Sequence, residues 1–150
     1  MFRVFSIISA LMLASIVQAQ ITNHEFKKEK KMNNKSILLE ANKAVLKGDY
    51  EAYLAYCTED TKWVFVGDRT LLGKEKVREY MKEVYIAPPV FTEELIMEEG
   101  DMVTVTGEIS LKNKAGVYQH YMYCDVWRFR DGKMAGVTAY VIEKTNSKAE

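Results

Sequence analysis

Long strand-like segments fill the second half of this sequence, and they constrain the fold more than any other feature. Residues 102–111 (MVTVTGEISL) alternate apolar and polar side chains, and a turn at residues 113–116 leads into residues 117–129 (VYQHYMYCDVWRF). Residues 130–133 (RDGK) are a strong hairpin signal before the last segment, residues 134–144. Because strands joined by short turns pair in antiparallel fashion, the chain is expected to build an antiparallel sheet.

The first half of the chain has the spacing of helices. Apolar residues recur every three or four positions from Ser36, which can cap the start of a helix, to Gly48, which can end it. Asp49 can cap a second helix, and residues 74–85 predict a third, which the prolines that follow cannot continue. The apolar stripe expected on the second helix comprises Tyr50, Tyr53, Leu54 and Cys57.

Shorter strands are predicted between and after these helices. Residues 61–66 (TKWVFV) are rich in β-branched and aromatic side chains, a brief partner follows at residues 69–72, and residues 91–98 are a further candidate. This order predicts an α+β domain in which helices pack on one side of a strongly curved antiparallel sheet. Such a sheet leaves a concave interior, which is a usual place for a small-molecule pocket.

The overall charge and the motifs narrow the possible partners. The 150 residues include 21 Lys and Arg against 21 Asp and Glu, and 48% are apolar, which suits one compact domain. Without a net positive charge, no general attraction to nucleic acid is expected. The sequence contains no phosphate loop, dinucleotide motif or spaced set of metal ligands, so we expect neither a cofactor nor a metal.

The first residues have the pattern of a signal peptide. Arg3 precedes an apolar run at residues 4–17, and Val17-Gln18-Ala19 resembles the small-residue site before signal-peptidase cleavage. A retained membrane anchor is disfavoured because the run is shorter than the roughly twenty residues that span a bilayer. We therefore expect a signal peptide at residues 1–19, a periplasmic or secreted protein, and no stable membrane anchor after cleavage.

A polar tether is expected at the start of the mature chain. Residues 20–35 are lysine-rich and have no apolar period, and Glu25 and Glu29 interrupt the positive charge. A solvated tether is therefore a better interpretation than a lipid or nucleic-acid patch. The folded domain is predicted at residues 36–145, followed by a tail at residues 146–150.

Cys57 and Cys124 are the cysteines of this sequence. Export permits a disulfide between them, but nothing in the sequence places them side by side. A disulfide and two separate thiols both remain open, and two separate buried thiols are the simpler interpretation.

Segments from both halves of the chain resemble one superfamily. They are residues 47–65 (KGDYEAYLAYCTEDTKWVF), residues 71–81 (LLGKEKVREYM) and residues 124–141 (CDVWRFRDGKMAGVTAYV). In this order they resemble the superfamily of nuclear transport factor 2, ketosteroid isomerase and the SnoaL-like polyketide cyclases, and most of all its SnoaL-like branch. The resemblance covers residues 36–144. It implies a cone-shaped, strongly curved antiparallel sheet packed with three helices around a deep pocket, and commonly a homodimer.

The resemblance carries over only part of the isomerase site. It implies that the isomerase tyrosine corresponds to Ala41, the general base to Phe65, and the protonated hydrogen-bond donor to Asp125. Steroid isomerase chemistry is rejected because Phe65 cannot act as a base. In SnoaL-like cyclases a pocket aspartate acts with a nearby histidine, but His120 lies at an odd offset from Asp125 on the same strand and is expected on the opposite face.

Strand alternation places Asp125 among aromatic side chains and makes it the candidate catalytic residue. In such surroundings a carboxyl loses hydration, which raises its pKa and lets it act as an acid or as a hydrogen-bond donor. Val141 is expected to join the same wall. The candidate ligand-binding residues are Tyr53, Trp63, Phe65, Tyr121, Tyr123, Trp127, Val137 and Ala139.

Two functional hypotheses follow. In the first, an exported SnoaL-like domain binds a small, largely apolar molecule in its cone, and Asp125 supplies acid–base chemistry of the isomerase, cyclase or dehydratase type. In the second, the aromatic interior is ordinary core and the protein is a non-catalytic binding module or a dimeric assembly module. An open cavity with a desolvated Asp125 favours the first hypothesis, whereas a filled interior with Asp125 paired to the backbone favours the second.

Overall fold

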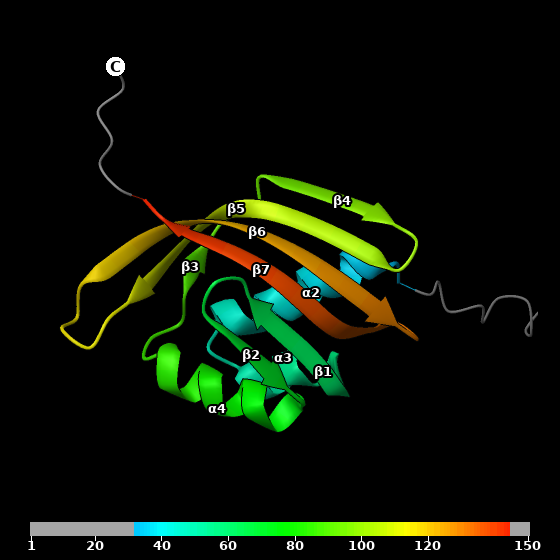
Figure 1. Ribbon diagram of the computed structural model, residues 1–150, viewed down its shortest axis with the longest axis horizontal. Coiled ribbons are helices and arrows are strands. Elements are labelled where there is room, and N and C mark those ends of the chain that lie inside the picture. Colours follow the sequence, from blue (N-terminus) through cyan, green and yellow to red (C-terminus); the bar gives the residue numbers. More distant parts are fainter. Residues whose placement is uncertain (1–31, 145–150) are drawn as a thin grey trace, which may run out of the picture. The chain divides into compact units, whose positions relative to one another are not determined.

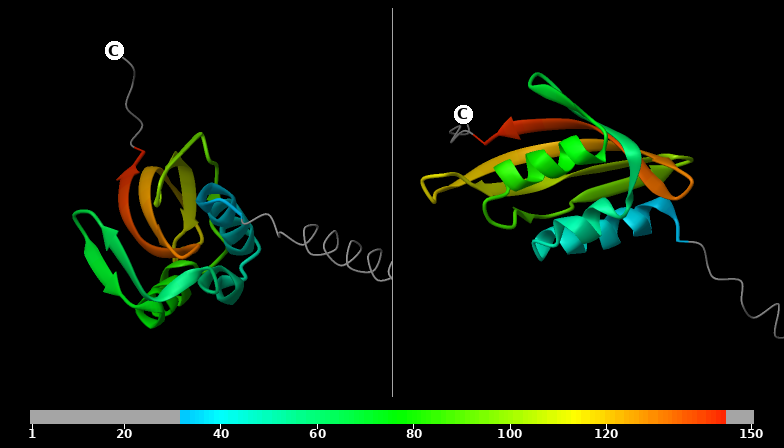
Figure 2. Two further views of the ribbon diagram at one scale, coloured as in Figure 1. Left: turned by 90° about the vertical axis from the view of Figure 1, so that its right-hand side faces the viewer. Right: turned by 90° about the horizontal axis from the view of Figure 1, so that it is seen from below.

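A curved sheet with helices on its concave side forms the fold (Figures 1 and 2). The structure is a computed structural model that describes residues 32–144. Its helices are α2 (Asn34–Leu46), α3 (Tyr50–Leu54) and α4 (Lys74–Val84). Its strands are β1 (Cys57–Phe65), β2 (Arg69–Leu72), β3 (Val90–Phe91), β4 (Leu95–Glu99), β5 (Met102–Lys112), β6 (Tyr118–Arg130) and β7 (Lys133–Glu143). The α+β fold class expected from the order of the segments is confirmed.

The strands form one seven-stranded sheet that does not close into a barrel. Its order is β2-β1-β7-β6-β5-β3, and β4 pairs with β5 beside β3. The long strands β5, β6 and β7 are antiparallel, as expected from their short connections. One junction differs from the antiparallel expectation, because β1 runs parallel to β7. These two strands are distant in sequence, so no hairpin fixes their relative direction.

The first helix begins earlier than the sequence predicted. Asn33, and not Ser36, is the N-cap, and its side chain accepts a hydrogen bond from the Ser36 amide at 2.9 Å. Asn34 and Lys35, assigned above to the tether, form the first turn of α2. Their amides donate to the two oxygens of Glu98 on β4, at 3.0 and 3.2 Å. A carboxylate from a distant strand thus satisfies free amides at the helix start, which local sequence cannot reveal.

Two other element boundaries also depend on tertiary contacts. Cys57 was expected on the second helix but begins β1, where it pairs with Met134 of β7. The single strand expected at residues 91–98 is divided into β3 and β4, which pair with separate parts of β5. Between them the backbone of Thr92 crosses Gly107 so closely that a Cβ atom there would lie 1.8 Å from the Thr92 oxygen. Glycine at this position is what permits the crossing.

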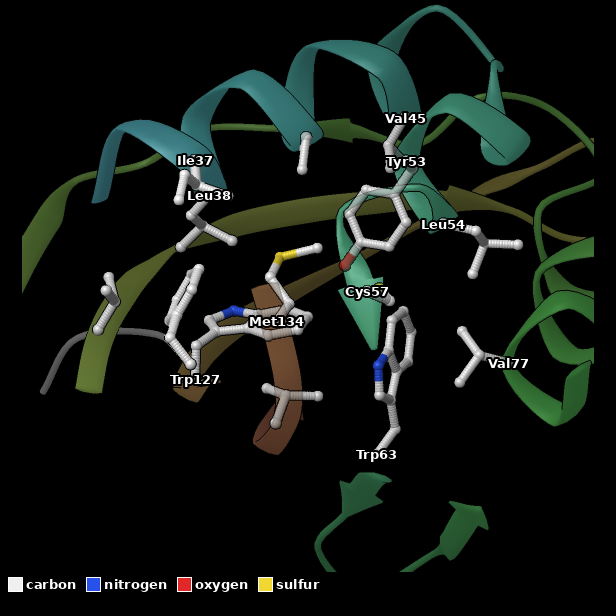
Figure 3. Close-up of a cluster of buried hydrophobic side chains, with 14 of the residues drawn as sticks. Ile37, Leu38, Val45, Tyr53, Leu54, Cys57, Trp63, Val77, Trp127 and Met134 are labelled. Carbon is white, nitrogen blue, oxygen red and sulfur yellow. The ribbon is translucent and has the colours of Figure 1, made fainter. Parts of the chain in front are cut away.

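The hydrophobic core lies between the helices and the concave face of the sheet (Figure 3). Leu38 and Val45 of α2 enter it from one side, and Met134 of β7 from the other. Trp63 and Trp127 belong to the same cluster and are almost fully buried. Within residues 32–144, no helix is long and apolar enough to cross a bilayer.

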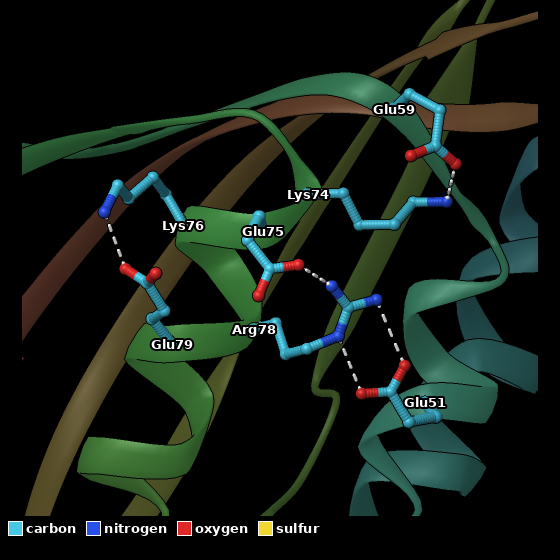
Figure 4. Close-up of polar contacts among 7 residues, drawn as sticks. All are labelled: Glu51, Glu59, Lys74, Glu75, Lys76, Arg78 and Glu79. Carbon is cyan, nitrogen blue, oxygen red and sulfur yellow. Dashed lines mark hydrogen bonds and ion pairs between the residues drawn. The ribbon is translucent and has the colours of Figure 1, made fainter.

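Ion pairs hold α4 against its neighbours (Figure 4). Arg78 contacts Glu51 of α3 through Nε at 2.7 Å and through a second guanidinium nitrogen at 3.1 Å. Lys74 at the start of α4 pairs with Glu59 of β1. Exposed pairs of this kind contribute little stability one by one, but here they fix the orientation of a helix that carries cavity residues on its other face.

Candidate ligand-binding site

An open cavity lies between the concave face of the sheet and the helices. Its volume is about 100 Å³, and it opens to solvent at its mouth. The interior is therefore not a filled core, and it has room for a small organic molecule. The lining residues are Asn42, Val45, Tyr53, Trp63, Phe65, Met81, Tyr85, Pro89, Phe91, Val105, Ile109, Tyr123, Asp125, Trp127, Val137, Ala139 and Val141.

Most of the residues selected from sequence meet at this cavity. The lining includes Asp125 and the predicted residues Tyr53, Trp63, Phe65, Tyr123, Trp127, Val137 and Ala139. Tyr121 does not line the cavity, contrary to the expectation from strand alternation, and is partly exposed. Its cross-strand neighbour on β5, Ile109, does line the cavity. The roles of these residues in ligand binding stay predictions.

Aromatic rings form adjoining walls of the cavity. The rings of Trp63 and Trp127 meet at 89° with centroids 5.8 Å apart, and Tyr53 meets Trp63 at 89° and 6.0 Å. Phe65 adds a further edge contact with Trp63 at 6.1 Å. Figure 3 shows the Tyr53 hydroxyl directed from α3 towards the two indoles. These edge-to-face contacts fix the rings without filling the space beside them.

Asp125 is the single carboxylate on the wall of this cavity. On β6 it lies between Val105 of β5 and Ala139 of β7, whose side chains offer it no polar partner. Within residues 32–144, no group donates a hydrogen bond to its carboxylate. Burial raises the pKa of Asp125 to about 7, although the side chain keeps some accessible surface, because that surface faces the cavity. Both its acid and its base forms are therefore populated near neutral pH.

Three tyrosines of the cavity wall lie close enough to Asp125 for its charge to act on them. Burial and, to a smaller extent, the Asp125 charge raise the pKa values of Tyr53, Tyr85 and Tyr123, so all three stay protonated as potential donors. The Tyr123 hydroxyl already donates to the Thr92 carbonyl at 3.0 Å. For Tyr53 and Tyr85, no partner of the hydroxyl is found within residues 32–144. These two tyrosines are therefore the ones free to bind a ligand.

Sequence reasoning missed two polar residues of the wall, Tyr85 and Asn42. Tyr85 follows α4 on the same apolar stripe as Met81, and this spacing was a usable signal. Asn42 of α2 donates to Glu93 through Nδ2 at 3.0 Å, and no local pattern distinguishes it from a solvated asparagine. Which helical residues face the cavity depends on how each helix packs on the sheet.

The side chains at the positions that correspond to the isomerase site agree with the rejection of steroid isomerase chemistry. Ala41 is fully buried, and Phe65 presents a hydrocarbon ring to the cavity. His120 is exposed on the opposite face, as predicted, and its Nδ1 lies 2.7 Å from Ser110 Oγ.

Cys57 and Cys124 are separate free thiols, which decides between the disulfide and the two separate thiols considered above. Within residues 32–144, no group of His, Cys, Asp and Glu could hold a metal ion.

The curved sheet, its three helices and the cavity between them define a nuclear transport factor 2-like fold. A family model for the SnoaL-like domain matches residues 39–137, and the chain therefore belongs to the SnoaL-like domain family. This confirms the resemblance inferred from the sequence. A search of curated proteins gave no match.

Solved structures support the same fold at low sequence identity. An NTF2-like protein of unknown function from Cytophaga hutchinsonii is 19% identical, with a TM-score of 0.59 over 73% of this chain and 100% of that one. A putative SnoaL-like polyketide cyclase from Jannaschia sp. is 13% identical, with a TM-score of 0.63 over 72% and 84%. TerC, co-crystallised with polyporic acid, is 22% identical, with a TM-score of 0.62 over 71% and 88%. At these identities the likeness establishes the fold alone.

Proposed function

We propose that this protein binds a small, largely apolar molecule in the cavity and promotes proton transfer on it through Asp125. The observation that carries the proposal is a desolvated carboxylate without a hydrogen-bond partner on the wall of an open aromatic cavity. The accessible surface of this carboxylate faces the cavity, so a polar group of a bound ligand can pair with it and relieve the cost of an unpaired polar group in an apolar wall.

The apolar body of the ligand would pack against the rings of Trp63, Phe65 and Trp127. Its polar end would lie at Asp125, with the hydroxyls of Tyr53 and Tyr85 as further donors. A carboxyl with a pKa near 7 can give a proton to a developing oxyanion, or remove one from an adjacent carbon or oxygen, without a cofactor. Isomerisation, cyclisation and dehydration are the reaction types that such a group assists.

Mass spectrometry of small molecules that co-purify with the exported protein tests the binding part of this proposal. We expect a ligand in the unaltered protein, and much less of it in Asp125→Asn. The matched control is Asp101→Asn, because Asp101 is an exposed turn residue and undergoes the same chemical change. If ligand occupancy is the same in all three proteins, Asp125 does not hold the ligand.

The catalytic part needs turnover of the molecule identified in this way. We expect Asp125→Asn to lose at least about 100-fold in kcat, since a single general acid or base contributes about that much or more. Unchanged turnover in this variant would remove Asp125 from the mechanism and leave a binding protein.

We further propose that the protein acts after export and as a homodimer. The export proposal rests on the signal-peptide pattern of residues 1–19, which lie outside the described residues. It is tested by the mass of the protein recovered from its native compartment, for which cleavage predicts a start at Gln20. The dimer proposal is supported by exposed apolar side chains on the convex face of the sheet, among them Met122, Tyr140 and Ile142.

A further inference from the structure

The charges around the cavity are of one sign. No lysine, arginine or histidine is among the lining residues, and Asp125 is the one charged side chain there. Outside the lining, Glu93 accepts a hydrogen bond from Asn42 of the cavity wall. Burial raises the pKa of Tyr123. The negative charges of Glu93, Asp125 and Glu94 raise it further, in that order of size. An anionic ligand would therefore find no cation among the lining residues and would be repelled by the ionised form of Asp125.

The positive charge of Arg69 is engaged by residues outside the cavity lining. Arg69 of β2 lies over the ring of Tyr80 at 5.9 Å, and its Nε pairs with Asp68 at 2.8 Å. Neither Arg69 nor Tyr80 lines the cavity. Within residues 32–144, Asp125 thus has no paired cation to balance it when it is ionised.

Aromatic faces near an unbalanced carboxylate are the elements of a site for an organic cation. The negative face of an aromatic ring attracts an ammonium group within about 6 Å, most strongly when the ring is an indole and the group is desolvated. Here two indoles meet at a right angle, and the rings of Tyr53 and Phe65 flank Trp63. The carboxylate supplies the counter-charge that such a cation needs when it is taken out of water.

We infer that the ligand of this cavity is a small protonated amine with an apolar body, whose ammonium group pairs with Asp125 against the faces of Trp63 and Trp127. This inference rests on the proposed function and gives it a substrate class. In the complex Asp125 is ionised, so its available role in catalysis is that of a proton acceptor.

The pairing of an ammonium group with Asp125 predicts how the affinity for the ligand changes with pH. An ammonium ligand requires the ionised form of Asp125, so its affinity rises as pH increases through the pKa of about 7. A neutral ligand that accepts a hydrogen bond from protonated Asp125 has the opposite dependence. The other titratable groups near Asp125 stay protonated over this range, because burial raises their pKa values. They are Tyr53, Tyr80, Tyr85 and Tyr123.

In the part of the chain that the structure describes, the cavity wall places no second charged group beside Asp125. Within the cavity wall, α2 contributes the neutral Asn42 and β1 contributes Trp63 and Phe65. The strands on either side contribute Val105 from β5 and Ala139 from β7. The pH dependence of amine binding between pH 5 and 8 therefore reports on Asp125.

Three probes with the same body and different head groups test the inference: cyclohexylmethylamine, cyclohexylmethanol and cyclohexanecarboxylate. The chain has two tryptophans, and both line the cavity, so tryptophan emission reports binding there. None of the probes absorbs or emits in this range. We expect the amine to bind at least about tenfold more tightly than the alcohol at pH 8, and the carboxylate to bind most weakly.

Two independent controls accompany this measurement. In Asp125→Asn the preference for the amine over the alcohol should fall to within about twofold, while Asp101→Asn should keep it. If Asp125→Asn does not fold, the pH series on the unaltered protein still decides. Between pH 5 and 8 the amine affinity should rise roughly 30- to 100-fold, the change in ionised fraction of a group with a pKa of about 7.

The results that would overturn the amine assignment differ from those that would overturn ligand binding in the cavity. An alcohol that binds as tightly as the amine, or an amine affinity that falls with pH, overturns the amine assignment and leaves a cavity that binds neutral ligands. Absence of amine binding overturns it as well. The binding part of the proposed function fails only if, in addition, no probe changes the tryptophan emission and no small molecule co-purifies.

Discussion

Asp125 and Glu108 lie on neighbouring strands of one sheet but on opposite faces. Glu108, on the convex face, is about half exposed and pairs with Lys144 at 2.7 Å. Asp125, on the concave face, has no partner within residues 32–144 and faces aromatic rings. Both are carboxylates on antiparallel strands, so residue type does not explain the difference. The side of the sheet to which a carboxylate points decides whether it is a solvated charge or an acid with a pKa near 7.

The same contrast extends to the other side chains of the two faces. The convex face carries the Ser110–His120 contact together with exposed apolar groups such as Ile142. On the concave face Asp125 has no such polar partner within residues 32–144, and aromatic and aliphatic side chains line the cavity beside it. We therefore expect chemistry on the concave face and association on the convex face.

The largest effect is expected from Gly107→Ala, on the concave face. The added Cβ would lie 1.8 Å from the Thr92 oxygen and 3.1 Å from a ring carbon of Tyr123, so the crossing between β3 and β4 must open. The expected loss is about 3–5 kcal/mol in the free energy of unfolding, measured by urea denaturation. Thr106→Ala, with its side chain on the convex face, is the control and should cost less than about 1 kcal/mol. Equal effects of the two changes would contradict this account.

Asp125→Asn should stabilise the ligand-free protein in a pH-dependent way. Because the folded pKa is raised above the ordinary 3.8, the contribution of Asp125 to stability is greatest below pH 4 and is lost as pH rises through about 7. Removing the charge should therefore gain about 2–4 kcal/mol at pH 8 and almost nothing at pH 4. Urea unfolding at both pH values measures this.

Glu108→Gln provides the comparison on the convex face. It should change stability by no more than about 0.5 kcal/mol at pH 8, because the pair with Lys144 is exposed. The contrast between the faces would be disproved if Asp125→Asn were destabilising at pH 8, or if both substitutions behaved alike.

Ile142→Asp should weaken the proposed dimer. Ile142 is 68% exposed and pairs with Met122 across the convex face, so a new charge there would be buried in the interface. Light scattering over a dilution series should give a dimer dissociation constant at least about tenfold higher. The control is Leu72→Asp, which places the same charge at an exposed leucine on β2. A chain that is monomeric at every concentration would rule out the dimer.

The smallest effect is expected from Ser110→Ala. The hydroxyl contacts His120 on an exposed part of the convex face, so its loss should cost about 0.5 kcal/mol or less. Binding of a cavity ligand should stay within about twofold of the unaltered protein. A large loss of activity in this variant would move the chemistry to the convex face and reverse the comparison.

Period-two alternation predicted which residues of β6 share a face with Asp125, and this prediction was sound for Tyr123 and Trp127. Alternation is a property of the strand itself, so it can be read from a few residues. It did not extend to Tyr121, which does not line the cavity although its cross-strand neighbour Ile109 does. A repeating pattern gives the direction of a side chain but not where the pocket ends.

Helix and strand boundaries show the same limit. The start of α2 depends on Glu98, the early end of α3 on the pairing of Cys57 with Met134, and the break between β3 and β4 on Gly107. Each cause lies far away in sequence. Local propensity predicted that these elements exist but could not place their ends.

The sequence by itself determined the α+β order, the family and the position of Asp125 among aromatic residues, because these depend on local periodicity and on motifs in order. Only the tertiary structure decided that the interior is an open cavity, that Tyr85 joins its wall, and that Asp125 has no partner within the described residues. Those facts depend on how helices and sheet pack, and packing is set by contacts between residues that are distant in the chain.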